Sequence, residues 1–225
     1  ALVESFVGNA VVRGLGVDYT KYPQIIDVKW SPTIAWQVAL FGLLAGIIAL
    51  VFVRVTLFIR GAMKKYVAWY PARPLIGGIL LAILIGACGW RDYQGFSFPL
   101  MLEAMNGATS GHFEVKLFLT ALTIGTGFVG GEVIPLLATG AMAGATFANL
   151  IGANVAVFAI VGSVAVLAGA TNTPLACTFI GIELFGGNGA ILFALACVAA
   201  YAASGHTGIY HAQKIVAHKS GEAIT

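Results

Sequence analysis

The feature that most constrains this chain is a long stretch with almost no charge. Between Lys116 and Lys214 the only residues with a formal charge are Glu132 and Glu183. Over all 225 residues, 59% are hydrophobic and 9% are charged, whereas a soluble domain carries about 25% charged residues. A fold with so much uncharged surface needs lipid as its solvent, so we interpret the chain as an integral, multi-pass membrane protein. The formal net charge of +3 is too small to indicate a nucleic-acid partner.

The first half contains segments that resemble membrane spans. A membrane helix needs about 20 apolar residues. The segment 31–53 has no charge and begins with Ser-Pro, which favours a helix start. Its apolar pattern continues past Arg54 towards Met63, so we expect one long, tilted helix. Three segments follow: a short Gly-rich span over 74–90, a re-entrant segment over 95–106 and a helix over 114–128.

The second half is apolar but repeatedly interrupted. Glycine or proline breaks occur at 130–131, 152, 169–174, 186–189 and 204–205. Several of the resulting pieces are too short to cross a bilayer at about 1.5 Å per residue. Broken helices at membrane depth are tolerated where they line a cavity or are buried in protein, and they are typical of transporter binding sites. We therefore expect an all-α, polytopic membrane protein with broken, tilted helices.

Positive charges in short loops predict the orientation. One basic group follows the first long helix and another lies near the end of the chain, and we place both in the cytoplasm. They consist of Arg60, Lys64, Lys65 and Arg73, and of Lys214 and Lys219.

The strongest local motif is GFVGGEVIP over 127–135. It predicts a flexible glycine hinge that leads into a helix whose first turn contains Glu132 and Pro135. A helix start carries unpaired N–H groups and a partial positive charge, so it is a candidate anion site. A second glycine break, SGHTGIY over 204–210, leads into the last helix, where Tyr210 offers an O–H donor. The two helix starts could converge on one anion.

The sequence contains no residue pattern typical of an enzyme or of a metal site. The cysteines lie in apolar runs, as buried thiols would, and form neither a Cys-x-x-Cys nor a Cys/His zinc motif. His206 and His211 have no companion carboxylate or cysteine nearby in the sequence. We find no Ser/His/Asp or HExxH constellation, and we expect no enzyme, no metal and no cofactor. The three cysteines are Cys88, Cys177 and Cys197.

GFVGGEVIPLLATGAMAG resembles the GxFxP-containing stretch of the CLC family of chloride channels and anion/proton antiporters. IVGSVAVLAGATNTPLACTFIGIELF is similar to the segments that follow there, and GHTGIYHAQKIVAHK resembles the start of that family's final helix with its anion-site tyrosine. The resemblance covers essentially all of residues 1–225, but only the second half of the family. It implies the C-terminal repeat of an inverted-repeat transporter, with a helix end over 1–14, an extracellular loop over 15–30, helices and re-entrant segments over 31–213, and a final helix with a cytoplasmic tail over 210–225.

The resemblance also implies an anion site made of backbone amides at Gly131, Glu132, Val133 and Ile134 together with the Tyr210 hydroxyl. Val133 stands where chloride-type members have Phe, and Glu132 where they have an aliphatic residue. This Gly-Glu-Val-x-Pro variant is similar to the family's fluoride/proton antiporter branch, although Ile134 stands where we associate Thr with that branch.

Glu132 is a functional candidate without the resemblance, because an ionisable residue in a membrane span is costly to bury. The alternative is a carboxylate stabilised by the helix dipole. Beside an anion the charged form of Glu132 would be disfavoured, whereas the protonated form would donate a hydrogen bond to a small anion. We expect Glu183 to be structural, capping a helix or bonding backbone at a helix break.

Three functions are left open: a proton-coupled halide antiporter, with fluoride favoured; a passive chloride channel of the same fold; and a structural membrane subunit. The expected partners are a halide anion (fluoride or chloride), protons and the lipid bilayer, in a bacterial inner membrane. The resemblance further implies a homodimer through residues 1–14, 174–187 and 190–204. The chain begins in an apolar stretch without Met, and the family's gating glutamate would lie upstream of Ala1. We therefore expect residues 1–225 alone not to transport.

Overall fold

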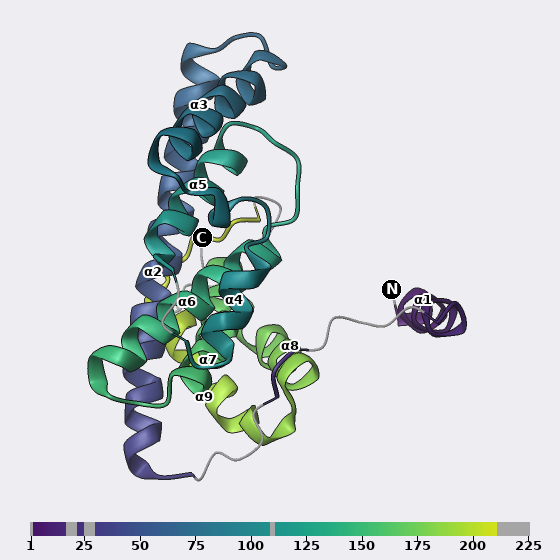
Figure 1. The fold of residues 1–225 in the computed structure, drawn as a ribbon, viewed down its shortest axis with the longest axis vertical. Coiled ribbons are helices and arrows are strands. Elements are labelled where there is room, and N and C mark those ends of the chain that lie inside the picture. The colour runs from purple at the N-terminus through teal and green to yellow at the C-terminus, as the bar shows by residue number, and fades with distance from the viewer. Residues whose placement is uncertain (1, 17–21, 25–29, 109–110, 211–225) are drawn as a thin grey trace, which may run out of the picture.

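The computed structural model describes residues 2–16, 22–24, 30–108 and 111–210, and in these ranges every regular element is a helix. This confirms the all-α prediction. Short 3₁₀ turns occupy Arg91–Tyr93 and Gly187–Gly189. The α-helices are α1 (Leu2–Gly14), α2 (Pro32–Tyr66), α3 (Ala72–Cys88), α4 (Phe98–Met105), α5 (Phe113–Gly125), α6 (Val133–Ile151), α7 (Val155–Thr171), α8 (Pro174–Phe185) and α9 (Ala190–Ala203) (Figure 1).

Helix α2 is the longest helix and runs along one side of the fold (Figure 1). Its start is capped as predicted: Ser31 Oγ accepts a hydrogen bond from the Ile34 N–H at 3.2 Å, and Pro32 is the first helical residue. The helix continues past Arg54 to Tyr66, which confirms one long helix. Its 35 residues extend over about 52 Å, compared with about 30 Å for the hydrocarbon core of a bilayer.

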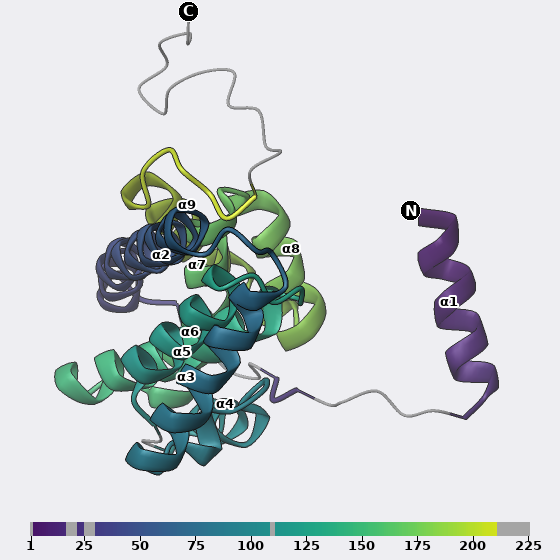
Figure 2. The ribbon, with the colours of Figure 1, turned by 90° about the horizontal axis from the view of Figure 1, so that it is seen from above.

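Helix α7 lies at the centre of the fold. All of its side chains from Phe158 to Thr171 are buried, beneath α2, α6, α8 and α9 (Figure 2). Glycines allow the backbones of α6 and α7 to approach closely. A Cβ added at Gly140 would clash with the Gly162 carbonyl, and one at Gly144 with the Phe158 carbonyl. Small residues at these positions are what permits such close packing.

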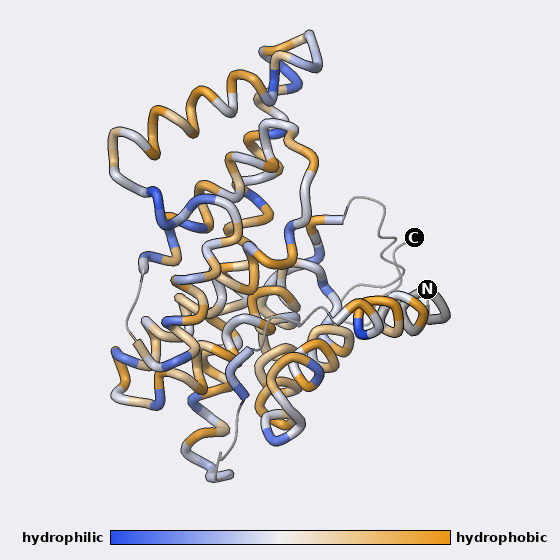
Figure 3. The backbone as a smooth tube through the Cα atoms, turned by 45° about the vertical axis from the view of Figure 1, so that its right-hand side comes forward, coloured by the Kyte–Doolittle hydropathy of each residue, from blue (hydrophilic) through white to orange (hydrophobic). Residues whose placement is uncertain are grey.

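Hydrophobic residues also cover the outside of the helices, while hydrophilic residues gather near helix ends and loops (Figure 3). On α2, Leu40, Leu44, Ile47 and Val51 are exposed at helical spacing, opposite the buried face of the helix. Among the described helices, α2 and α6 are long and apolar enough to cross a membrane, whereas α3, α7, α8 and α9 are apolar but shorter. The pattern of short, interrupted helices is therefore as predicted.

Several boundaries differ from the prediction. Helix α5 ends at Gly125 rather than near residue 128, because the chain turns at Gly127, whose φ of +102° suits glycine. Glu132 lies directly before α6 instead of in its first turn. Tyr210 is not helical, and the rest of the predicted final helix lies outside the described residues. The predicted loop over 15–30 is described only in part, and α1 lies apart from the other helices (Figures 1 and 2).

Candidate functional site

The start of α6 forms the first wall of the candidate site. The chain between Gly127 and Glu132 is not helical, and the half-buried Glu132 occupies the position just before the helix. The Glu132 carbonyl accepts the Leu136 N–H at 3.2 Å, which is the first bond of the helical ladder. Helix geometry leaves the N–H groups of Val133 and Ile134 without an acceptor inside the helix, and Pro135 has no N–H. Two backbone donors thus directly follow Glu132 in the chain.

The second wall is the segment that follows α9, and it is tied to the end of α7. Gly205, with φ +74°, turns the chain. The Ile209 N–H then donates to the Ala170 carbonyl at 3.0 Å. The Ser204 hydroxyl donates to Asn172 Oδ1 at 3.3 Å, and the Asn172 amide approaches the His206 carbonyl at 3.5 Å. Asn172 therefore ties the end of α7 to the segment that follows α9.

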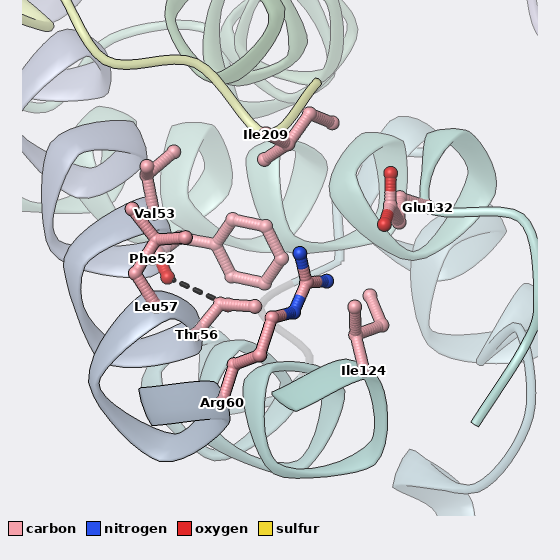
Figure 4. A pocket seen from close by; sticks show the side chains of 8 residues that line it. All are labelled: Phe52, Val53, Thr56, Leu57, Arg60, Ile124, Glu132 and Ile209. Atoms are coloured by element: carbon pink, nitrogen blue, oxygen red, sulfur yellow. Dashed lines mark hydrogen bonds between the residues drawn. The ribbon is translucent and has the colours of Figure 1, made fainter. Parts of the chain in front are cut away.

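These two walls meet at a small cavity beneath α2 (Figure 4). It is lined by Phe52, Val53, Thr56, Leu57, Arg60, Ile124, Glu132 and Ile209. Its volume is about 10 Å³, which corresponds to roughly one water-sized probe. The arrangement brings the Glu132 carboxyl group to a water-sized space that is also lined by Ile209, the residue before Tyr210.

The structure brings Glu132 and Ile209, the neighbour of Tyr210, to the small cavity, but it distributes the other predicted residues. Gly131 is exposed and lines a larger cavity of about 670 Å³ on the other side of the glycine loop. Val133 is exposed and Ile134 half-buried, and neither side chain lines the small cavity. Any role of these three residues would therefore rest on their backbone N–H groups.

Arg60 is one of two residues that sequence analysis missed. It was assigned only to the basic group after the first long helix, yet its side chain extends from α2 towards the part of the small cavity where Glu132 and Ile124 lie (Figure 4). A signal was available: Phe52 and Thr56 lie on the buried face of α2, and Arg60 follows at the next four-residue step. Residues four apart share one helix face.

Lys116 was also missed. Its side chain is 2% exposed, and its ammonium donates to the carbonyls of Tyr93 at 3.1 Å and Gly95 at 2.5 Å. These bonds hold the turn before α4 and place Lys116 in the wall of the larger cavity. Nothing in the charge pattern distinguished this lysine from one at a helix end.

The structural role expected for Glu183 is not seen among the described residues. It is exposed on α8, and in the part of the chain that the structure describes its side chain makes no hydrogen bond. His112 and Glu114 are exposed and contact one another at 3.1 Å, as a solvated face would. Within the described residues no three His, Cys, Asp or Glu side chains form a metal-binding group, and His211 lies outside these residues.

Comparison with known proteins decides the family. The model of the voltage gated chloride channel family matches residues 1–205. The chain belongs to this family. Members of the voltage gated chloride channel family are integral membrane proteins that act as channels or transporters, so the predicted membrane class and the resemblance are both confirmed.

The relatives agree with this assignment. A chloride/fluoride channel protein of Pseudomonas syringae is 36% identical over 224 residues, covering 95% of this chain and 49% of the relative. The crystal structure of a CLC-type fluoride/proton antiporter matches with a TM-score of 0.88 at 29% identity, covering 95% of this chain and 54% of that one. A cyanobacterial Cl⁻/H⁺ antiporter shares the fold, with a TM-score of 0.66 at 22% identity over 84% of this chain and 48% of that one. The chain thus spans about half the length of these relatives.

Proposed function

We propose that the protein containing these residues transports halide across a membrane, as a fluoride/proton antiporter. The observation that carries the proposal is the meeting of Glu132 and Ile209, the residue before Tyr210, at one water-sized cavity beside the start of α6. The identity to a chloride/fluoride channel protein and to a fluoride/proton antiporter supports the same substrates. A passive chloride channel and a structural subunit are the alternatives.

The chemistry of the site favours fluoride. A fluoride ion is close to a water molecule in size, whereas chloride is larger, and the cavity has room for about 10 Å³. The groups nearby are hydrogen-bond donors: the N–H groups at the helix start, the phenol O–H of Tyr210 and a protonated Glu132. A small, hard anion gains most from such donors, because the charge is concentrated near them.

The same carboxyl group supplies the coupling to protons. An anion in the cavity disfavours the negative form of Glu132, so anion and proton occupancy are linked. The protonation of Glu132 therefore depends on whether an anion occupies the cavity, and this dependence links the two fluxes. A passive channel needs no such linkage, which separates the two alternatives by experiment.

We expect the intact protein in liposomes to release fluoride at least about tenfold faster than chloride, because the water-sized site penalises the larger ion by about 1.4 kcal/mol or more. Fluoride efflux should drive a measurable proton flux in the opposite direction. Ion-selective electrodes for both halides and a pH electrode check this. Equal fluoride and chloride rates would contradict fluoride selectivity, and fluoride flux without proton flux would favour the channel.

We further propose a homodimer in a bacterial inner membrane. Leu175 and Phe179 on α8 and Ile191 on α9 are 73%, 68% and 63% exposed, while Ile182 and Leu195, expected at the same surface, are partly buried against the core. Exposed apolar faces in lipid associate by close packing.

We expect crosslinking in bilayers to yield dimers, and Phe179→Ala to reduce the dimer yield severalfold relative to Phe58→Ala on α2. A monomer at all protein-to-lipid ratios would contradict the dimer, and membrane fractionation tests the location.

A further inference from the structure

Helix α7 ends at a residue whose backbone is left-handed. Asn172 follows Thr171, the last residue of the helix, and has φ +57° and ψ +35°. Glycine adopts this conformation without strain, so the backbone alone would accept glycine at least as well. What asparagine adds is a side chain with an acceptor oxygen and a donor nitrogen. The contacts of that side chain therefore indicate its role.

Both ends of the Asn172 amide contact the segment that follows α9. Its Oδ1 accepts a hydrogen bond from the Ser204 hydroxyl at 3.3 Å, and its Nδ2 donates to the His206 carbonyl at 3.5 Å. Ser204 is buried, and its hydroxyl also lies 3.2 Å from the Tyr201 carbonyl. The two contacts of Asn172 lie on either side of Gly205, where the chain turns with φ +74°. Asn172 thus bridges this turn.

The same segment is held a second time, next to Tyr210. The Ile209 N–H donates to the Ala170 carbonyl at 3.0 Å, one of the carbonyls that the end of α7 leaves without a helical partner. The Ile209 side chain is buried and lines the small cavity (Figure 4). Residues 204–210 are not helical and include two glycines, so without these attachments the segment would have many conformations. The position of Tyr210 therefore depends on both of them.

We propose that Asn172 is a positioning residue for the anion site. Its amide holds the turn at residues 204–206 against the end of α7 and thereby fixes the position of Tyr210. This inference rests on the proposed function, in which the Tyr210 hydroxyl donates to the bound halide. A hydrogen bond is strong only over a narrow range of distances and angles, so a displaced phenol binds the ion less well. Asn172 itself lines neither the small nor the larger cavity and acts through the segment.

Hydrogen exchange of the intact protein reads the segment itself. Asn172→Gly keeps the left-handed backbone accessible and removes both contacts of the amide. We expect exchange of the peptide that contains Ile209 to rise about threefold or more, because its bond to the Ala170 carbonyl opens more often. The matched control is Asn154→Gly at the other end of α7, where the Asn154 side chain accepts the Val157 N–H at 3.2 Å. This control should leave the exchange of that peptide unchanged.

Calorimetric titration with fluoride reads the effect on the site. Asn172→Gly should raise the Kd about threefold or more, which corresponds to the loss of a hydrogen bond, and Asn154→Gly should leave it unchanged. Ser204→Ala should raise it less than Asn172→Gly does, because it removes one of the two contacts. In a Tyr210→Phe background, Asn172→Gly should change the Kd by less than about 1.5-fold, because the donor that it positions is gone.

Each measurement can overturn the proposal. Unchanged exchange in Asn172→Gly would mean that the amide does not hold the segment. Faster exchange with unchanged affinity would mean that the segment does not position the site, and equal losses with and without the phenol would make Asn172 merely structural. A protein that binds neither halide would overturn the proposed function and with it a role at an anion site, even where exchange shows that the amide holds the segment. If the unaltered protein binds chloride instead of fluoride, only the selectivity fails, and the same comparison with chloride decides the role of Asn172.

Discussion

Replacing Glu132 with Gln should reduce fluoride transport by intact protein at least about tenfold. Glutamine keeps the size of the side chain and can still donate a hydrogen bond to an anion, but it cannot bind or release a proton. Because Glu132 lies directly before α6 and lines the water-sized cavity, the variant loses the group that links proton and anion occupancy. Fluoride efflux and proton flux from liposomes measure the effect, and proton flux should fall at least as far as fluoride efflux.

The chain supplies a matched control for this substitution. Glu183 is the other acidic residue in the uncharged stretch, it is exposed on α8, and it lines neither cavity. Glu183→Gln should therefore keep the unaltered rate within about twofold. Equal losses in the two variants would return Glu132 to a structural role. So would a loss in Glu132→Gln that is fully explained by aggregation in size-exclusion chromatography.

Replacing Tyr210 with Phe should weaken fluoride binding by about tenfold. Phenylalanine keeps the ring and removes the O–H donor, and a hydrogen bond to a charged group contributes about 1.5–3 kcal/mol, so a tenfold loss is the low end of the range. Calorimetric titration of the intact protein with fluoride measures the affinity. Tyr66→Phe is the control, because Tyr66 is exposed at the end of α2 and lines neither cavity.

The double variant tests whether Tyr210 and Glu132 act on the same ion. If both contact it, the combined loss in Glu132→Gln/Tyr210→Phe should be smaller than the product of the single losses, because neighbouring groups are not additive. Losses that multiply would place the two groups at separate ions. An unchanged affinity in Tyr210→Phe would remove the phenol from the site.

Local sequence signals were sufficient for most helix boundaries. The Ser-Pro pair specified the start of α2, and the breaks at Gly152 and Asn172 lie where the backbone enters the left-handed region, with φ of +66° and +57°. Such conformations are accessible to Gly and Asn at low cost, so the sequence marks them directly. The start of α6 was misplaced by one residue, because Glu132 and Val133 carry no signal that separates the residue before a helix from its first turn.

By itself, the sequence determined that the chain is helical, that lipid is its solvent, that its second half is broken into short pieces, and which helix start carries Glu132. These properties follow from composition and from contacts a few residues apart. Only the tertiary structure decided that Arg60 on α2 reaches the cavity of Glu132 and that the Ala170 carbonyl holds the segment of Tyr210 beside it. Those positions depend on how closely α2, α6 and α7 pack, and the packing depends on contacts between residues far apart in the chain. No local pattern encodes such contacts.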